Sequence, residues 1–315
     1  MCRGVSRGTT DMCMENQLIT EIQQLKKEKN AIILAHYYVN DELQALADYV
    51  GDSFYLAKVA KGTDADVVVF CGVSFMGESA KMLNPEKKVL MPDLTADCPM
   101  AHMAQVTKIK KLREKYEDLA VVCYINSTAE LKSCSDVCVT SSNAVNIVKR
   151  LPNKNIFFIP DVNLGRFVAE QVPEKNVILN DGYCPIHKGI NAAGVQAQKE
   201  KHPNALVMAH PECEESVLAL ADYIGSTAEM IAFAKQSDCM EFIVCTEEGV
   251  KHRLRSDNPE KNFYFGGEYL CRDMKLNTLE KVLHVLKTGE NEMLLPADVC
   301  ERAVKPLDRM LELVR

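Results

Sequence analysis

One feature of this 315-residue sequence restricts its fold more than any other: a long stretch occurs three times. The clearest copies are HYYVNDELQALADYVGDS, which starts at His36, and HPECEESVLALADYIGST, which starts at His210. A weaker copy in the same register, YINSTAELKSCSDVCVTS, starts at Tyr124, so the three starts lie 88 and 86 residues apart. Internal similarity of this length predicts a chain built from three homologous units.

The second half of each unit repeats as well. The segments NPEKKVL, VPEKNVI and NPEKNFY contain Pro85, Pro173 and Pro259, again 88 and 86 residues apart. An aspartate also falls twelve residues after the start of every copy, at Asp48, Asp136 and Asp222. The duplication therefore extends over whole units and is not confined to one short motif.

Short apolar runs alternate with amphipathic stretches along the chain. The clearest runs are 31–35, 67–71, 119–125, 156–160, 205–209 and 242–245. This alternation predicts an α/β fold of three homologous α/β/α units, each with a small parallel sheet, in a pseudo-three-fold arrangement around a central site. The predicted boundaries are a loose N-terminal tail (1–17), three α/β repeats (18–104, 105–191 and 192–275) and a C-terminal helical segment (276–315) with a short strand at 293–295.

Composition excludes several classes of protein. The chain is 47% hydrophobic, which is enough for a sizeable core, and its net charge of −7 is opposite to that of a typical nucleic-acid-binding protein. No apolar run approaches the roughly 20 residues that cross a bilayer. The polar N-terminus lacks the apolar region of a secretory signal, so we predict a cytoplasmic protein without membrane or nucleic-acid partners.

Three of the thirteen cysteines stand at matched places in the repeat. Cys98, Cys184 and Cys271 follow the prolines of their units by 13, 11 and 12 residues. Any one of them alone would be read as a small buried side chain. Together they predict a shared site for a soft metal, and three thiolates on a 4Fe-4S cluster would leave one iron open as a Lewis acid.

Polar side chains follow the first predicted strand of every unit. Because alternate residues of an extended segment point the same way, the pairs that can face one cavity are His36 with Tyr38, Tyr124 with Asn126, and His210 with Glu212. These side chains supply proton donors, proton acceptors and a carboxylate. His187, three residues after Cys184, can also lie near this site.

A hydroxyl residue falls seventeen positions after the start of each copy, at Ser53, Ser141 and Thr227. Each stands where a helix is expected to begin. One interpretation is a set of helix N-caps. The other is an anion site, in which the hydroxyls and free backbone N–H groups hold a carboxylate or phosphate. Both interpretations can hold at once.

With these residues in view, the chain resembles the quinolinate synthase family, from about Leu18 to Leu313. The resemblance rests on the motifs AHYY, ELQALADYVGDS, DCPMAHM, YINSTAELK, TSSNAV, PDVNLG, GYCPIHKGI, HPEC, DYIGST and the single Cys271 before NTLE. It implies three α/β domains around a central site, and an enzyme of NAD biosynthesis. The implied substrates are iminoaspartate and dihydroxyacetone phosphate, which are condensed to quinolinate with loss of phosphate and water. An L-aspartate oxidase is the implied source of iminoaspartate.

The resemblance also implies roles for individual residues. It assigns the three ligands of a 4Fe-4S cluster to Cys98, Cys184 and Cys271. It assigns substrate binding to His36, Ser53, Tyr124, Asn126, Ser141, His210, Glu212 and Thr227. It makes Tyr38 a catalytic acid/base, and we add Glu212 and His210 as catalytic residues. Some members carry a C-x-x-C-x-x-C run near the last ligand, whereas here Cys271 stands alone.

Two other classes of function fit part of the pattern. An iron–sulfur hydro-lyase acting on a hydroxy acid would use the same open iron but would need no phosphate-binding group. A non-catalytic redox or ligand sensor on the same scaffold would need no acid/base pair such as Tyr38 and Glu212.

Overall fold

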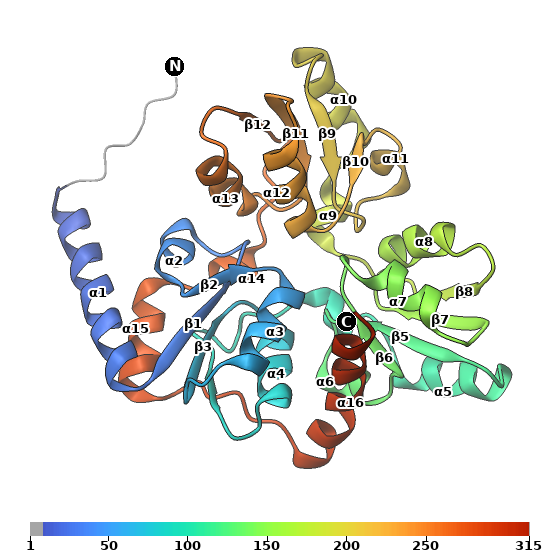
Figure 1. Cartoon of the computed structure of the whole chain (residues 1–315), viewed down its shortest axis with the longest axis horizontal. Helices are drawn as coiled ribbons and strands as arrows, with labels where there is room; N and C mark the ends of the chain where they lie inside the picture. Colours follow the sequence, from blue (N-terminus) through green and yellow to red (C-terminus); the bar gives the residue numbers. More distant parts are fainter. Residues whose placement is uncertain (1–8, 315) are drawn as a thin grey trace.

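The computed structural model describes residues 9–314, in which three α/β units are followed by two C-terminal helices (Figure 1). The elements of unit 1 are α1 (Thr9–Glu28), β1 (Ala31–His36), α2 (Asp41–Leu46), β2 (Tyr49–Gly51), α3 (Ser53–Gly62), β3 (Val67–Cys71), α4 (Ser74–Leu83), β4 (Lys88–Leu90) and a short 3₁₀ helix (Pro99–His102). Those of unit 2 are α5 (Val106–Lys115), β5 (Ala120–Tyr124), α6 (Ala129–Ser133), β6 (Val137–Val139), α7 (Ala144–Arg150), β7 (Asn155–Ile159), α8 (Val162–Gln171), β8 (Asn176–Leu179) and α9 (Pro185–Gly189).

Unit 3 repeats the same order of helices and strands. Its elements are α10 (Ala192–Lys201), β9 (Leu206–Ala209), α11 (Glu215–Leu218), β10 (Tyr223–Ile224), α12 (Thr227–Gln236), β11 (Glu241–Cys245), α13 (Val250–Asp257), β12 (Asn262–Tyr264) and α14 (Arg272–Lys275). The chain then ends in α15 (Leu279–Thr288) and α16 (Ala297–Leu313). The predicted unit boundaries fall between a short helix that ends one unit and the helix that follows it, and they stay predictions.

The sheets confirm the predicted fold class. Each of the three sheets in the described chain has four parallel strands in the same order, β2-β1-β3-β4, β6-β5-β7-β8 and β10-β9-β11-β12. All six predicted strands are confirmed to within one residue at each end. Because the strands are parallel, their carboxyl ends meet at one edge of each sheet, where ligands bind in α/β proteins.

The repeated aspartates have a structural role. Each accepts the backbone N–H of a residue in or beside the first strand of its own unit. The three contacts are Asp48 Oδ2 with Ile33 N at 2.7 Å, Asp136 Oδ2 with Val121 N at 2.7 Å, and Asp222 Oδ2 with Val207 N at 2.8 Å. A bonded carboxylate at the same register explains why this position is the same in all three copies.

Two predictions about the ends of the chain are wrong. Helix α1 already begins at Thr9, so residues 9–17 are helical and not a loose tail; this stretch has no Gly or Pro to interrupt a helix. Residues 1–8 lie outside the described part of the chain. The predicted strand at 293–295 is reduced to one antiparallel bridge between Leu90 and Glu292, because Leu294 is 75% exposed and Pro296 then begins the approach to α16.

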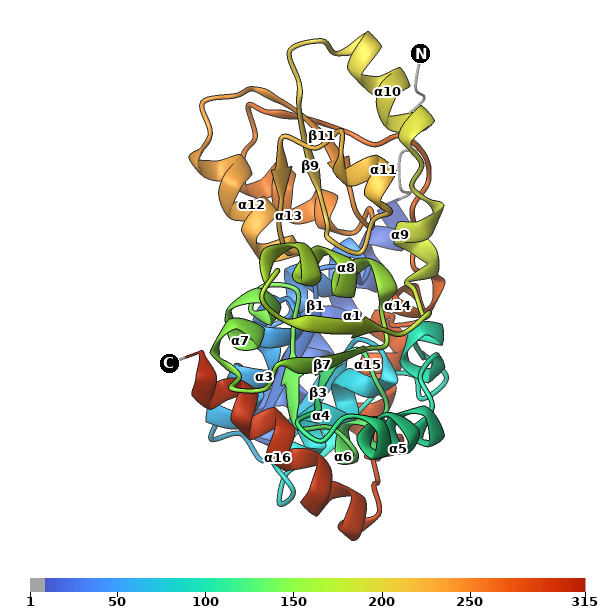
Figure 2. The ribbon, with the colours of Figure 1, turned by 90° about the vertical axis from the view of Figure 1, so that its right-hand side faces the viewer.

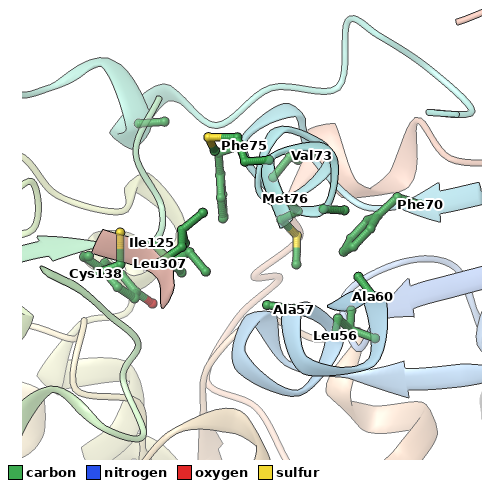
Figure 3. Close-up of a cluster of buried hydrophobic side chains, with 14 of the residues drawn as sticks. Leu56, Ala57, Ala60, Phe70, Val73, Phe75, Met76, Ile125, Cys138 and Leu307 are labelled. Carbon is green, nitrogen blue, oxygen red and sulfur yellow. The ribbon is translucent and has the colours of Figure 1, made fainter. Parts of the chain in front are cut away.

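The hydrophobic core is not distributed evenly over the three units. One cluster joins units 1 and 2 with α1, α15 and α16, and Figure 3 shows Phe75 and Met76 of α4 beside Ile125 and Leu307 within it. Helix α16 packs against α6, β6 and α4, on the side of the molecule away from unit 3 (Figure 2). Unit 3 has separate clusters on the two faces of its sheet. Among residues 9–314, no helix is both long and apolar enough to cross a membrane.

Candidate active site

A cavity of about 260 Å³ lies where the three units meet, and every residue predicted for the site lines it. The predicted residues in its wall are His36, Tyr38, Ser53, Cys98, Tyr124, Asn126, Ser141, Cys184, His210, Glu212, Thr227 and Cys271. His36 and Tyr124 end β1 and β5, and His210 directly follows β9. The equivalent strand ends of the three units therefore contribute to one shared space.

The three matched cysteines occupy equivalent positions in the structure. Cys98 directly precedes the 3₁₀ helix, Cys184 precedes α9 and Cys271 precedes α14. Burial raises the pKa of all three thiols, to about 11 for Cys271, so that each thiol keeps its proton at neutral pH while no metal is bound.

The three thiols do not converge closely enough for one ion to bind all of them. In the described chain, the metal-binding atoms that lie within 4.8 Å of one another belong to Cys184, His187 and Glu212, and the three thiols form no such group. Thiols too far apart for one ion suit a cluster, in which each thiolate binds a different iron. One cysteine from each unit therefore fits an iron–sulfur cluster with three protein ligands.

The structure separates the two interpretations of the repeated hydroxyls. The side chains that cap α3 and α12 are Asp52 and Ser226, so Ser53 and Thr227 are the first residues inside their helices. Ser141 lies three residues before α7. The N-cap interpretation is therefore wrong for all three. Their placement in the cavity wall is the one that the anion interpretation requires.

A line of polar side chains in close contact runs along the cavity wall and involves all three units. The Tyr124 hydroxyl donates to Glu212 Oε1 at 2.6 Å. Glu212 Oε2 lies 2.7 Å from His187 Nδ1, an ion-pair distance without the geometry of a hydrogen bond. His187 Nε2 lies 2.9 Å from the Thr246 hydroxyl, which lies 2.8 Å from the Tyr38 hydroxyl. These contacts connect the carboxylate of Glu212 to the phenol of Tyr38 through two side chains.

The two ends of this line differ in charge. Burial raises the pKa of Glu212, but the nearby imidazoles of His187 and His210 and the hydrogen bond from Tyr124 outweigh burial and lower it to about 2. Burial raises the pKa of Tyr38 well above its usual value, against the hydrogen bonds from Thr227 and Thr246. At neutral pH the site thus contains an ionised carboxylate and a protonated phenol.

Two further observations concern the polar wall. Burial lowers the pKa of both His36 and His210 to about 3, against the opposing charge of Glu212, so both imidazoles are neutral at pH 7. The amide oxygen of Asn126 is buried and has no hydrogen-bond partner among the described residues. A buried acceptor without a partner in a cavity wall indicates a position where a ligand donates a hydrogen bond.

Some residues of the cavity were not predicted from the sequence. They include Asp52, Thr140, Glu247 and Arg272, while His187 was placed only near the site. Thr246 is not among the lining residues, but it contacts two that are, Tyr38 and His187. Glu247 follows the third strand of its unit by two residues, as Asp161 does in unit 2, so this shared offset could have identified both acids. Thr246 has no hydroxyl counterpart in the other units, where Gly72 and Pro160 stand, so the repeat offered no signal for it.

The fold and the site define an α/β enzyme with a central three-cysteine centre, shared by three homologous units. The chain belongs to the family described as "Quinolinate synthetase A protein" (NadA), which matches residues 20–312.

Relatives named quinolinate synthase are similar over nearly their full length. The one from Fusobacterium nucleatum is 53% identical over 292 residues, which cover 93% of this chain and 98% of the relative. The one from Clostridioides difficile is 50% identical and covers 95% of this chain and 99% of its own length. The one from Aquifex aeolicus is 48% identical and covers 94% of both chains.

Proposed function

We propose that this chain condenses iminoaspartate with dihydroxyacetone phosphate to quinolinate, with loss of phosphate and water. The observation that carries the proposal is convergence: three thiols, three hydroxyls and an acid/base pair from three separate units line one cavity. Relatives of about half-identical sequence, all named quinolinate synthase, support the same activity.

Cys98, Cys184 and Cys271 would hold a 4Fe-4S cluster, which fits their equivalent placement in the three units and their presence in one cavity wall. When bound, such a cluster supplies one iron without a protein ligand, and this iron is a Lewis acid for a substrate carboxylate or hydroxyl. The thiols would give up their protons when the cluster is loaded.

The polar wall would bind the substrates. Both substrates are anions, and Ser53 and Ser141 present hydroxyls in the cavity wall that make no hydrogen bond to another residue of the described range 9–314. Neutral His36 and His210 can donate hydrogen bonds to a carboxylate or phosphate without adding charge. The unpartnered amide oxygen of Asn126 would accept a hydrogen bond from the imine or enamine nitrogen.

The line from Glu212 to Tyr38 would move the protons. The enamine carbon of iminoaspartate would attack the phosphate-bearing carbon of the triose, so that a C–C bond forms and phosphate leaves. Isomerisation of the remaining hydroxyketone to a hydroxyaldehyde would let the nitrogen close the ring on the aldehyde with loss of one water, and loss of the neighbouring hydroxyl as a second water would make the ring aromatic. Ionised Glu212 would accept protons lost from carbon, and protonated Tyr38 would donate to an oxygen that leaves as water. His187 and Thr246 would return protons between these two groups without bulk water.

The chemistry of iminoaspartate also bears on its supply. This imine hydrolyses readily in water, so an oxidase acting on L-aspartate in the same cytoplasm would have to deliver it. The proposal includes this functional coupling but needs no direct contact between the two enzymes.

The experiment is an assay of anaerobically reconstituted protein with freshly generated iminoaspartate and dihydroxyacetone phosphate, with iron and sulfide counted in the same sample. We expect quinolinate from the unchanged chain, and loss of both cluster and product in Cys98→Ala, Cys184→Ala and Cys271→Ala. Cys239→Ala is the matched control, because the Cys239 thiol donates to the carbonyls of Asn204 and Glu241 and is not among the residues that line the cavity. No product from protein with a full cluster would reject this activity and would direct the search to dehydration of hydroxy acids. Equal iron in all four variants would reject the ligand set.

A further inference from the structure

The main chain ties each cysteine loop to the same place in its unit. In every unit the carbonyl two residues before the cysteine accepts the N–H of the residue three positions beyond the third strand. The three hydrogen bonds are Ser74 N to Ala96 O at 2.8 Å, Val162 N to Gly182 O at 2.8 Å, and Glu248 N to Tyr269 O at 2.9 Å. The loops that carry the thiols therefore leave the three sheets in the same way.

In units 2 and 3 a buried carboxylate adds a second tie. Asp161 Oδ2 accepts the N–H of Cys184 at 3.1 Å, and Glu247 Oε1 accepts the N–H of Cys271 at 3.0 Å. The second oxygen of each acid accepts an N–H at the start of the next helix, from Leu164 at 2.7 Å for Asp161 and from Gly249 at 2.6 Å for Glu247. Each acid lies two residues beyond the third strand and is almost completely buried. Each therefore joins a cysteine loop to the body of its unit.

Unit 1 makes the same contact from a different position. Val73 stands where the other units have Asp161 and Glu247, and its side chain cannot accept a hydrogen bond. Asp97, the residue before Cys98, replaces it: its Oδ1 accepts the N–H of Cys98 at 2.8 Å and the hydroxyl of Ser74 at the start of α4. A carboxylate recovered from a non-equivalent position indicates that the contact with the cysteine N–H is itself required, and is not a remnant of the duplication.

We propose that Asp97, Asp161 and Glu247 are positioning residues that hold the three thiols ready for the cluster. The inference rests on the proposed three-cysteine cluster. A rigid cluster needs its three ligands at fixed separations. Here the ligands come from three units, each of which has its own β-sheet. Burying a carboxylate is energetically unfavourable unless its oxygens are hydrogen-bonded. The oxygens of these three acids accept hydrogen bonds from the cysteine loops, which offsets this unfavourable free energy. Such outer contacts commonly control how tightly a metal is retained.

The test uses Asp161→Asn and Glu247→Gln. An amide keeps one oxygen, which can still accept the helix N–H, but its NH₂ group cannot accept from the cysteine. After anaerobic reconstitution and transfer to an iron chelator, we expect these variants to lose iron on the order of 10-fold faster than the unchanged chain. Asp222→Asn is the matched control, since Asp222 accepts the Val207 N–H at 2.8 Å but does not line the cavity.

Hydrogen exchange of the iron-free protein gives a second measurement that a general loss of stability would not reproduce. We expect faster amide exchange in the peptide containing Cys184 for Asp161→Asn and in the peptide containing Cys271 for Glu247→Gln, with exchange in the sheets unchanged. Iron loss and loop exchange equal to those of Asp222→Asn would overturn the proposal. If the unchanged chain assembles no cluster, the proposed function fails, and the exchange of the iron-free loops still decides whether the carboxylates position the cysteines.

Discussion

At the scale of single residues, the chemistry of the cavity depends on where a few protons reside. Tyr38 keeps its proton because burial disfavours the phenolate, and its hydroxyl contacts Thr227 at 2.6 Å and Thr246 at 2.8 Å. Glu212 is ionised because its contacts with His187 and Tyr124 outweigh the cost of burial. A buried donor and a buried acceptor with pKa values shifted in opposite directions are the usual pattern of a general acid and a general base.

Replacing Tyr38 tests this assignment. Tyr38→Phe removes the proton donor and retains the ring, so we expect turnover to fall on the order of 10²- to 10⁴-fold, the usual contribution of a general acid, while the iron content stays unchanged. The measurement is the quinolinate rate per cluster. Tyr37→Phe is the matched control: Tyr37 does not line the cavity, so this variant should form quinolinate at the normal rate. An unchanged rate in Tyr38→Phe would remove this residue from the chemistry.

At the scale of elements, the repeated PEK motif explains how each sheet is joined to its helices. Its lysine binds carbonyls at or just beyond the C-terminus of the helix that precedes the third strand. Lys87 binds Thr63 O and Ala65 O, Lys175 binds Leu151 O and Asn153 O, and Lys261 binds Ala234 O and Ser237 O. A cation at this position satisfies free carbonyls and complements the helix dipole. In the sequence this motif indicates duplication. The structure shows that its lysine also links the loop before the fourth strand to the end of a helix.

Replacing one of these lysines tests that role. Lys261→Met keeps most of the aliphatic chain but removes the ammonium group that lies 2.7 Å from Ala234 O, so we expect a loss of about 1–2 kcal/mol in the free energy of unfolding. Lys235→Met is the control, because Lys235 is an exposed residue of α12, the helix whose carbonyl Lys261 binds. This variant should change the free energy of unfolding by less than about 0.5 kcal/mol. Urea unfolding of both variants is the measurement. Equal stabilities would show that the lysine contact contributes nothing measurable.

At the scale of the whole molecule, the cavity is the place where the three units meet. Units 1 and 2 share one core with the terminal helices, whereas unit 3 has cores of its own. His36 from unit 1 and His210 from unit 3 are enclosed only because these parts come together. Both are neutral in the folded protein, since burial lowers each pKa to about 3. In the unfolded chain each would titrate near its ordinary pKa of about 6.5.

This difference makes folding depend on pH. Between pH 6.5 and pH 3 the unfolded chain binds more protons than the folded chain, so the free energy of unfolding falls as the pH is lowered through this window. Each histidine contributes up to about 1.4 kcal/mol per pH unit, or about 2.7 kcal/mol for the pair. Urea unfolding of the iron-free protein at pH 7, 6 and 5 measures the slope. His36→Gln should remove about half of the contribution from the pair, and a slope equal to that of the unchanged chain would contradict this account.

The sequence by itself determined the three units, six of the twelve strands, the alternation of strands with helices and the matched thiols of Cys98, Cys184 and Cys271. It could do so because duplication leaves its marks at constant spacing, and because apolar periodicity is a local property of the chain. It also identified the side chains at the ends of the first strands, since parallel strands place their carboxyl ends at one edge.

Only the tertiary structure decided how these residues work together. It excluded the N-cap role of Ser53 and Thr227, connected Glu212 to Tyr38 through His187 and Thr246, and showed Asp97 in the place left by Val73. The contacts from Glu212 to Tyr38 join residues from different units, whose separation along the chain follows no fixed period. No pattern in the sequence carries them, because they arise only when the three units close around a common centre.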